Sequence, residues 1–486
     1  MSSYSWITIG VPDDYDQIAA IVDPVFDPNS VAGALRNAIS PGVKGVLIET
    51  GYIDKDYRST FYNFYAKKGR VYRSDCVRLH FFDGQVNFDQ TKTALLCPDD
   101  KPGDHYYGYI VLRPTLVSTI GRSILSPDIR NGAHGMVIQW EHQVHLLGYK
   151  LQVWGFPSMA QHTDIAVCAH VSCWAILRHY SERFPQHREL LIHEITKLAQ
   201  QFDPGGLTPS LGLNVLQAER IFQAAGSYPL IVKRDKLPGG DERFVGQLLA
   251  YLESGFPLFI AMSEHAHAIV VVGHSWTGAA AVPPPAGSLT QSQLGSLVAV
   301  DDNHLPYICI DAAGTAGYQL DDIDAFIVPL PDKIYYPASA VDRQSTLLHQ
   351  KLGTMMNLPA SGDLIRRFYV TTLSALRRFA RERASQLGDV LVGAIMRLRT
   401  SQFIWVVEYS SCEQWNKGQV AARAFLDATA SPYDPTPMWL VHDENTAIFF
   451  DRGSSVNAAN LVDLKRPSGT PLGRMEQNLR PIVPLV

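Results

Sequence analysis

Residues 161–177 read QHTDIAVCAHVSCWAIL, a stretch in which Cys168 opens a strongly apolar segment. The pattern predicts a helix that begins at Cys168 and runs to about Glu182, with Pro185 just beyond it as a stop signal. Its first two turns are apolar on most sides, so we expect this helix to be buried rather than amphipathic. The thiol would then lie at a helix N-terminus, where free backbone N–H groups converge.

A histidine opens a second apolar segment about a hundred residues further on, where residues 267–274 read HAIVVVGH. Five apolar residues follow His267, which predicts a strand fixed in the core with the imidazole at its mouth. Attack on an amide needs a thiolate, and a helix N-terminus together with an imidazolium lowers the pKa of a free cysteine, ~8.5, by several units. Cys168 and His267 are therefore the candidate nucleophile and base of a cysteine-dependent site.

A third group has to orient the imidazole and hold its tautomer. The candidates follow the next hydrophobic strand, at Asp301, Asp302 and Asn303, and we favour them in that order. An acid at the end of a strand, one strand further along a sheet, is well placed for this role. Gln161, seven positions before Cys168, can turn its side-chain amide toward the same spot. An oxyanion hole requires such a donor, supplemented by the backbone N–H of the cysteine.

These residues together carry a family resemblance. A glutamine before Cys-x5-Trp-x2-Leu-Arg, then Gly-x-Pro leading to His-Ala-Ile-Val-Val-Val-Gly, then an acid after a strand, resembles the papain-like cysteine peptidases. The pattern is most similar to the bacterial type that processes the double-glycine leaders of bacteriocins. The resemblance covers residues 160–315, about a third of the chain. It implies a papain-like fold with Cys168 as nucleophile, His267 as base, Asp301 as orienting acid and Gln161 as oxyanion donor.

The chain departs from this family pattern at two points. Ala169 follows the cysteine where those peptidases usually have glycine, and their glutamine stands six residues before the nucleophile rather than seven. A rival register also exists, because residues 171–175 read VSCWA and resemble the GSCWA stretch of papain. That register would leave Gln161 twelve residues upstream of Cys173 and would remove the first turn of an apolar helix. We therefore expect Cys173 to be a small apolar residue of the helix interior.

His265 is the competitor for the role of base. It precedes His267 by two residues, so on a continuous strand both side chains would point the same way. Its position before the apolar run begins makes it the weaker candidate.

The chain has 486 residues, which is too long for one ordinary core and predicts two or three domains. We expect an α+β protein with a strand-rich region of unknown role at 1–150 and a papain-like peptidase domain at 151–332, in which helices precede an antiparallel sheet. A mixed helical and strand region is expected at 333–486. Further helices are predicted at 188–201, 211–225, 243–253 and 363–383, and neighbouring strands at 257–261, 268–272, 296–300 and 307–310.

Composition excludes several other classes. A formal net charge of −5 indicates neither a nucleic-acid nor a membrane partner. No apolar run approaches the ~20 residues that cross a bilayer, and the first residues lack the layout of a secretory signal. The six scattered cysteines have neither disulfide-scaffold nor zinc-finger spacing. We expect a reduced, cytoplasmic protein whose chemistry needs no metal and no organic cofactor.

The resemblance implies a cysteine hydrolase, a peptidase that cleaves peptide or isopeptide bonds of a peptide or protein substrate. Two alternatives stay open. One is an acyltransferase or transglutaminase-like enzyme on the same fold, and the other is a catalytically inactive papain-like protein whose flanking regions bind a partner. Residues 203–209 and 279–292 are the segments expected to determine specificity.

Overall fold

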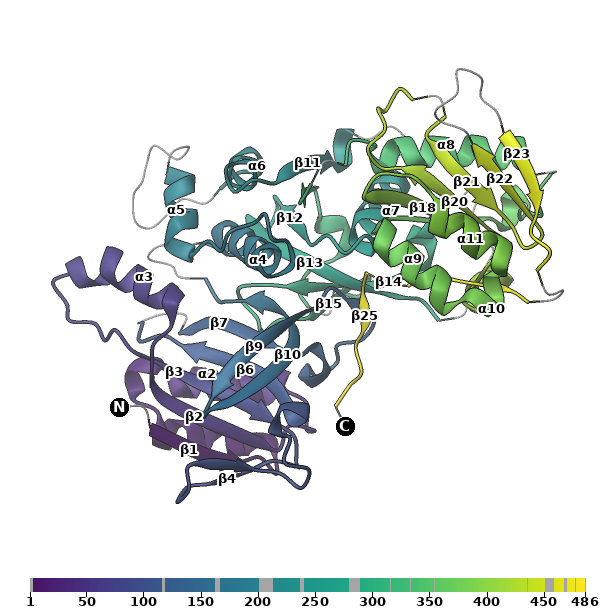
Figure 1. Ribbon diagram of the computed structural model, residues 1–486. Coiled ribbons are helices and arrows are strands. Elements are labelled where there is room, and N and C mark those ends of the chain that lie inside the picture. The colour runs from purple at the N-terminus through teal and green to yellow at the C-terminus, as the bar shows by residue number, and fades with distance from the viewer. Residues whose placement is uncertain are drawn as a thin grey trace.

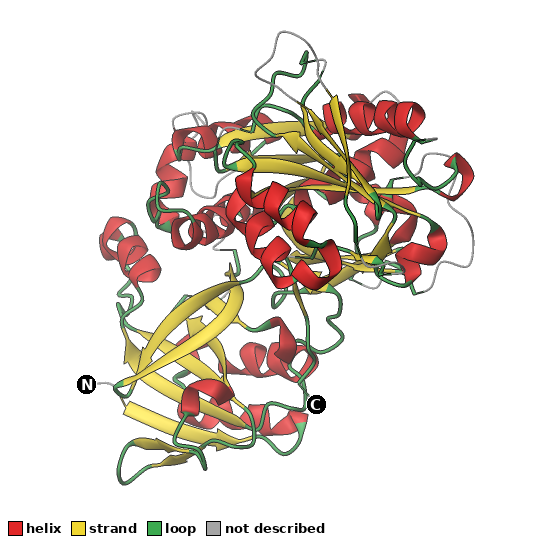
Figure 2. Ribbon diagram, turned by 45° about the vertical axis from the view of Figure 1, so that its right-hand side comes forward, coloured by secondary structure: helices red, strands yellow, loops and turns green. Residues whose placement is uncertain are grey.

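The computed structural model describes residues 3–115, 119–161, 167–200, 213–236, 240–278, 289–314, 316–332, 334–353, 355–434, 436–450, 459–466, 470–476 and 478–485. Within these ranges three large antiparallel sheets follow one another along the chain, each with helices packed against it (Figures 1 and 2). The prediction of an α+β protein with antiparallel sheets is confirmed. None of the helices in the described part of the chain has the length and apolarity that crossing a bilayer requires.

The first sheet has seven strands in the order β1-β2-β3-β6-β7-β10-β9. Its strands are β1 (Ser3–Thr8), β2 (Gly45–Tyr52), β3 (Cys76–Phe82), β6 (Tyr106–Leu112), β7 (Ile120–Leu125), β9 (Trp140–Leu146) and β10 (Tyr149–Ser158), and the hairpin of β4 (Asn87–Asp89) and β5 (Ala94–Leu96) stands apart. The helices of this region are α1 (Ile18–Ile21), α2 (Pro28–Ala38) and α3 (Lys55–Asn63). Strand β3 is buried along its whole length, which explains its aromatic and β-branched composition.

The second sheet carries the predicted site. It runs in the order β11-β16-β12-β13-β14-β15, with β8 paired to β13 and β25 paired to β8. The elements are β8 (Met136–Val137), α4 (Cys168–Arg183), α5 (Ile192–Gln200), α6 (Val215–Ala224), β11 (Tyr228–Lys233), α7 (Gly240–Glu253), β12 (Leu258–Met262), β13 (His267–Trp276), β14 (Leu294–Val300), β15 (Ile308–Asp311), β16 (Ala325–Leu330) and β25 (Arg480–Pro481). The strands predicted as neighbours are consecutive in the sheet, and α4 begins at the predicted residue.

The third sheet has six strands in sequence order, β17-β18-β20-β21-β22-β23. The elements are α8 (Ala338–Leu352), β17 (Ile365–Thr372), α9 (Leu373–Glu382), α10 (Ala384–Leu387), α11 (Asp389–Arg397), β18 (Phe403–Ser410), α12 (Cys412–Asn416), β19 (Gln419–Val420), β20 (Ala422–Asp427), β21 (Met438–His442), β22 (Thr446–Phe450), β23 (Ala459–Asp463) and β24 (Leu472–Gly473). Alternate residues of β18 enter different cores: Trp405 packs with the large central core, whereas Ile404 packs with the core under α9 and α11.

The helix predicted at 363–383 is wrong in its first half. Residues Ile365–Thr372 form strand β17, and only Leu373–Glu382 form helix α9. The run Phe368-Tyr-Val-Thr-Thr favours a strand, and the side chain of Thr372 caps the helix by accepting a hydrogen bond from the Ala375 N–H.

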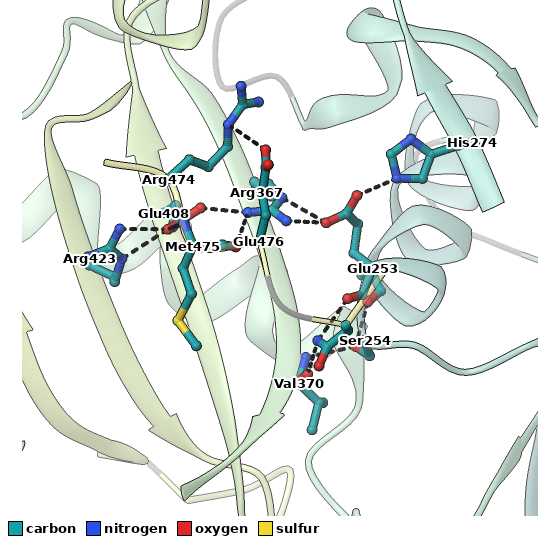
Figure 3. Close-up of polar contacts among 12 residues, drawn as sticks. Glu253, Ser254, His274, Arg367, Val370, Glu408, Arg423, Arg474, Met475 and Glu476 are labelled. Carbon is teal, nitrogen blue, oxygen red and sulfur yellow. Dashed lines mark hydrogen bonds and ion pairs between the residues drawn. The ribbon is translucent and has the colours of Figure 1, made fainter. Parts of the chain in front are cut away.

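A buried charge network joins the second and third sheets (Figure 3). Arg367 of β17 bonds both to Glu253 at the end of α7 and to Glu408 of β18, the latter at 2.8 Å. Arg423 lies 2.8 Å from Glu408, and His274 bonds to Glu253. Burial opposes ionisation of Glu253, but the adjacent Arg367 and His274 lower its pKa to about 2. The charges therefore stabilise one another only while the two sheets remain packed together.

Residues 478–485, which we call the strap, touch all three sheets. Asn478 donates to the backbone carbonyls of Glu253 and Val370, both at 2.9 Å. Strand β25 then pairs with β8, and the Leu485 N–H donates to the carbonyl of Asp128 at 2.8 Å, beside the first sheet. Figure 1 shows this segment descending between the C-terminal and N-terminal regions.

Candidate active site

The fold places Cys168 and His267 on adjacent elements. Cys168 is the first residue of α4, and His267 is the first residue of β13, against which α4 packs. The Ser172 hydroxyl, one turn into α4, donates to the carbonyl of Ala268 at 3.2 Å. The start of the helix is thereby tied to the start of the strand, and both side chains line one cavity of about 390 Å³.

A tight turn between β12 and β13 brings His267 into this position. The Ala266 N–H donates to the Ser263 carbonyl at 3.0 Å, and Ala266 adopts a left-handed conformation with φ of +48°. This conformation is costly for a residue with a Cβ, by roughly 1–2 kcal/mol. The strand can begin only after the turn, so His267 lies at its mouth as predicted.

The His267 ring contacts all three side chains proposed to orient it. Its Nε2 lies 2.9 Å from Asp301 Oδ1, 3.6 Å from Asp302 Oδ1 and 3.5 Å from Asn303 Nδ2. The Asp301 side chain is fully buried, and its Oδ1 also accepts the N–H of Asn303 at 3.0 Å. Asp301 is thus the nearest partner of the ring, as predicted, whereas Asp302 and Asn303 lie at nearly equal distances from it.

The electrostatic environment of His267 favours the protonated, positively charged form of its ring. Burial opposes the charge on His267, but hydrogen bonds with Asp301 and Cys168 and the charges of Asp301 and Asp302 raise its pKa to about 10. Burial alone would raise the pKa of Asp301, yet the hydrogen bond with His267 and the N–H of Asn303 lower it. At neutral pH the site therefore holds an imidazolium against an ionised Asp301.

The pKa of Asp302 is raised, whereas that of Asp301 is lowered. Burial and the adjacent Asp301 carboxylate raise its pKa to about 7, although the His267 charge works against this shift. Two carboxyl groups this close do not both ionise readily, so the proton stays on the one farther from the imidazolium.

Tyr318 is a residue that the sequence analysis missed. Its ring stacks on that of His267 with a centroid distance of 5.7 Å and an interplanar angle of 22°. Burial, the Asp301 charge and a hydrogen bond with Asp301 raise the Tyr318 pKa to about 12, against a hydrogen bond with Asn303. The ring covers the imidazole–carboxylate contact on one side. Nothing in the local sequence distinguishes this tyrosine, because the contact arises from a turn beyond the end of β15.

His265 lies away from the base position. It belongs to the turn before β13, so the expectation that it shares a strand with His267 is wrong. The left-handed Ala266 between them breaks the alternation of the strand. The Nε2 of His265 lies 3.1 Å from Asp322 Oδ2, and its ring meets Tyr318 edge-on at 5.3 Å.

Cys173 lies inside the core. Its side chain has no exposed surface, and burial raises the pKa of the thiol. A sulfur in this position cannot reach a substrate in the cavity, whereas Cys168 lines it.

Gln161 reaches the site through Asn303. Its Nε2 donates to Asn303 Oδ1 at 3.3 Å, and Asn303 in turn contacts the His267 ring. Among the hydrogen bonds of the described residues, none joins Gln161 to Cys168. Its role as an oxyanion donor therefore stays a prediction, and residues 162–166 lie outside the described residues. So do residues 203–209 and 279–288 of the expected specificity segments, whereas residues 289–292 are described at the start of a short 3-10 turn.

The site also offers one set of side chains with suitable spacing for a metal ion. One ligand atom from each of His267, Asp301 and Asp302 lies within 4.8 Å of the others, which no other group of the described residues achieves. Imidazole and carboxylate suit several divalent metals. The His267 Nε2 and Asp301 Oδ1 already share a hydrogen bond, so a metal would have to displace that proton.

The arrangement supplies the parts of a thiol-dependent acyl transfer. A thiol at a helix N-terminus and an imidazole line the same cavity, and a buried carboxylate fixes that imidazole. The chain, compared with protein-family models, with curated proteins and with solved structures, has no match.

Proposed function

We propose that the protein is a papain-like cysteine hydrolase that cleaves peptide or isopeptide bonds. The observation that carries this proposal is that Cys168 and His267 line one cavity, with Asp301 Oδ1 2.9 Å behind the ring. A nucleophile, a base and a group that orients the base form a constellation recognised by geometry rather than by sequence order.

The two nitrogens of the His267 ring have different roles in the proposed mechanism. Asp301 engages Nε2, which leaves Nδ1 to exchange a proton with the sulfur. The Cys168 thiolate attacks the carbonyl carbon, and the C–N bond then breaks as His267 donates its proton to the leaving amine. Water, deprotonated by the neutral His267, attacks the resulting thioester, releases the carboxylic acid and restores the thiol. The Cys168 N–H, with Gln161 as the second expected donor, stabilises both oxyanions.

The cavity supports an apolar side chain next to the scissile bond. Leu213 and Val215, at the start of α6, face Phe259 and Met262 of β12 across it. Among the described residues of the lining, only Asn214 and Ser263 add polar side chains besides Cys168 and His267. Burying an apolar group of the substrate here contributes binding energy without leaving an unpaired polar atom.

The experiment that tests the proposal compares Cys168→Ala with Cys173→Ala, using a thiol-directed electrophile and a peptide library. Cys168→Ala should keep the circular-dichroism spectrum of the wild type and lose both labelling and cleavage. Cys173→Ala should retain both. Labelling that survives in Cys168→Ala and disappears in Cys173→Ala would overturn the assignment.

The same assay separates hydrolysis from acyl transfer and from an inactive protein. Adding candidate amines and weighing the products distinguishes a free acid from an amide conjugate. Labelling of Cys168 without cleavage of any library member would identify an inactive relative.

A further inference from the structure

A second and larger cavity, of about 920 Å³, lies against the first sheet. The sheet curls until its edge strand β9 approaches β3, where Arg78 Nη2 donates to the His145 carbonyl at 3.1 Å. Helix α4, which contacts β9 and β10, adds Arg178 and Glu182 to the lining. Figure 1 shows α3 and α4 above this sheet. The cavity shares no lining residue with the cavity of Cys168.

Three arginines from three different elements line it. Arg78 lies on β3, Arg122 on β7 and Arg178 on α4, and their side chains are only 8%, 11% and 3% exposed. A carboxylate holds each guanidinium group in place: Glu49 at 2.8 Å from Arg78, Asp54 at 2.9 Å from Arg122, and Asp56 at 3.2 Å from Arg178. A guanidinium has five N–H donors, so one carboxylate fixes its orientation without using all of them.

An aromatic ring lies beside each of these arginines, and for Arg178 it is Trp174, with a centroid distance of 5.8 Å. The Arg78 guanidinium lies 4.1 Å from the centroid of Tyr52, and Arg122 lies 6.0 Å from that of Tyr109. Stacking fixes the planes of the guanidinium groups and leaves their edges free to donate. Trp140 adds a further aromatic side chain to the wall.

Three polar atoms of lining side chains have no hydrogen-bond partner among the described residues: Nε2 of His142, Nε of Arg122 and Nη1 of Arg178. The last of these forms an ion pair with Glu189. His142 is 8% exposed and bonds to the backbone of Gly155, while burial lowers its pKa to about 4. Its ring is therefore neutral and offers one acceptor in the cavity wall. A buried polar atom of this kind is paired in most proteins, by protein or by ligand.

Charges of both signs line the cavity, because Glu49, Glu141 and Glu182 lie beside Lys55 and the three arginines. Burial together with the charges of Arg178 and Arg122 lowers the pKa of Lys55, at its rim, to about 8. The same two arginines oppose a charge on His142. Burial is the largest cause of both shifts, and the charges of Asp56 and Glu182 act in the opposite direction on Lys55.

We propose that this cavity binds a small phosphorylated ligand with a planar ring. The phosphoryl oxygens accept hydrogen bonds from Arg78, Arg122 and Arg178, and the ring lies against Trp140. Three guanidinium groups that converge from separate elements match the several oxygens of a phosphoryl group better than the two of a carboxylate. The volume is that of an ordinary small-molecule site.

Calorimetric titration of the full chain carrying Cys168→Ala tests the proposal without requiring peptidase activity. The probes are ATP, inorganic pyrophosphate and adenosine. We expect ATP to bind, pyrophosphate to bind more weakly, and adenosine to bind at least tenfold more weakly than ATP. Equal affinity for ATP and adenosine, or no heat from ATP at about 1 mM, would overturn the assignment.

Four variants locate the site. Arg122→Met should weaken ATP binding at least tenfold, whereas Arg36→Met, at a salt-bridged arginine outside this cavity, should leave it unchanged. Because Arg122→Met strands Asp54 and can unfold the region, two changes at less buried residues serve as a second test. Lys55→Gln should weaken binding severalfold, and Glu182→Gln, which removes an exposed negative charge, should strengthen it. Unchanged affinity in both would place the ligand elsewhere.

Discussion

His267 lies between a carboxylate and a thiol, and its charge governs how that thiol reacts. Its pKa of about 10 keeps the ring protonated over the whole neutral range. A positive charge against the sulfur favours the thiolate, which is the reactive form. The rate of alkylation therefore reports directly on this pair of residues.

We expect iodoacetamide to alkylate Cys168 more slowly in His267→Gln than in the wild type at neutral pH. The wild-type ring, whose pKa is about 10, carries a positive charge beside the sulfur, and the variant lacks that charge. Mass spectrometry of the peptide that contains Cys168 measures both rates. Equal rates in the two proteins would contradict a Cys168–His267 ion pair.

Asp302 makes a separate prediction about stability. Its folded pKa of about 7 lies above the ordinary value of 3.8, so the folded state holds this proton more tightly than the unfolded chain does. Stability from this group is greatest below pH 3.8, and it is lost as the pH rises toward 7. Asp302→Asn removes the titration. Its free energy of unfolding relative to the wild type should therefore increase by on the order of 2 kcal/mol from about pH 5 to 8.

Urea denaturation at the two pH values measures this difference. Asp75→Asn is the control, because Asp75 pairs with Arg73 outside this site and that pairing lowers its pKa, so its titration lies at acid pH. A difference between Asp302→Asn and wild type that does not vary with pH would contradict the shared-proton description of this pair.

Helix α6 contributes Val215 to the cavity beside Cys168, so we expect it to influence which substrates bind. Val215 is its first residue and lines the cavity beside Cys168, whereas Leu216 is 56% exposed and does not. A glutamate in the first turn is compatible with the helix dipole at either position. We expect Val215→Glu to lower kcat/KM about tenfold to a hundredfold for peptides with an apolar residue at this subsite, since the pocket loses an apolar wall.

Leu216→Glu should leave kcat/KM unchanged, and thermal unfolding of both variants should match the wild type. Hydrolysis of paired peptides with leucine or serine at the position nearest the scissile bond provides the measurement. Equal losses in the two variants would show that the effect comes from α6 as a whole and not from the cavity wall.

At the scale of elements, the sequence predicts α4 and the strands around β13 well because their patterns are local. The apolar run after Cys168 predicts the start of α4, and the apolar run after His267 predicts the start of β13. Asp301 follows β14, which pairs with β13, and it therefore lies beside His267. Strand β17 was mistaken for a helix because Arg366 and Arg367 interrupt its apolar pattern. In the fold both arginines are buried and paired with acids from other elements, which no local pattern reveals.

Contacts that depend on the curvature of a sheet, or on a turn that is distant in the sequence, cannot be predicted either, because no local pattern reveals them. Tyr318 meets His267 only because the turn after β15 folds back over the end of β14. Arg78, Arg122 and Arg178 converge only because the first sheet curls toward α4. Each of these residues looks ordinary in its own segment.

At the scale of the whole molecule, Arg367 lies at the contact between the second and third sheets, where it pairs with Glu253 and Glu408. Arg367→Met should lower the free energy of unfolding by about 3–5 kcal/mol, because Glu253 and Glu408 would remain buried beside fewer positive charges. Arg381→Met, on the exposed face of α9, should change it by less than about 0.5 kcal/mol. Chemical denaturation followed by tryptophan fluorescence measures both. A small loss in Arg367→Met would mean that apolar packing alone holds these sheets together.

The strap can make its contacts only after the residues of all three sheets have been synthesised. Residues 478–485 leave the ribosome after all three sheets. Their backbone bonds to β8 and to Asp128, and the side chain of Asn478 bonds to the end of α7. The first and second sheets also contact each other directly, for example where the Tyr307 hydroxyl donates to the Leu125 carbonyl, but the edge of β8 is covered only after translation has passed this segment. Until then the edge of β8 remains available to chaperones or to pairing with another nascent chain.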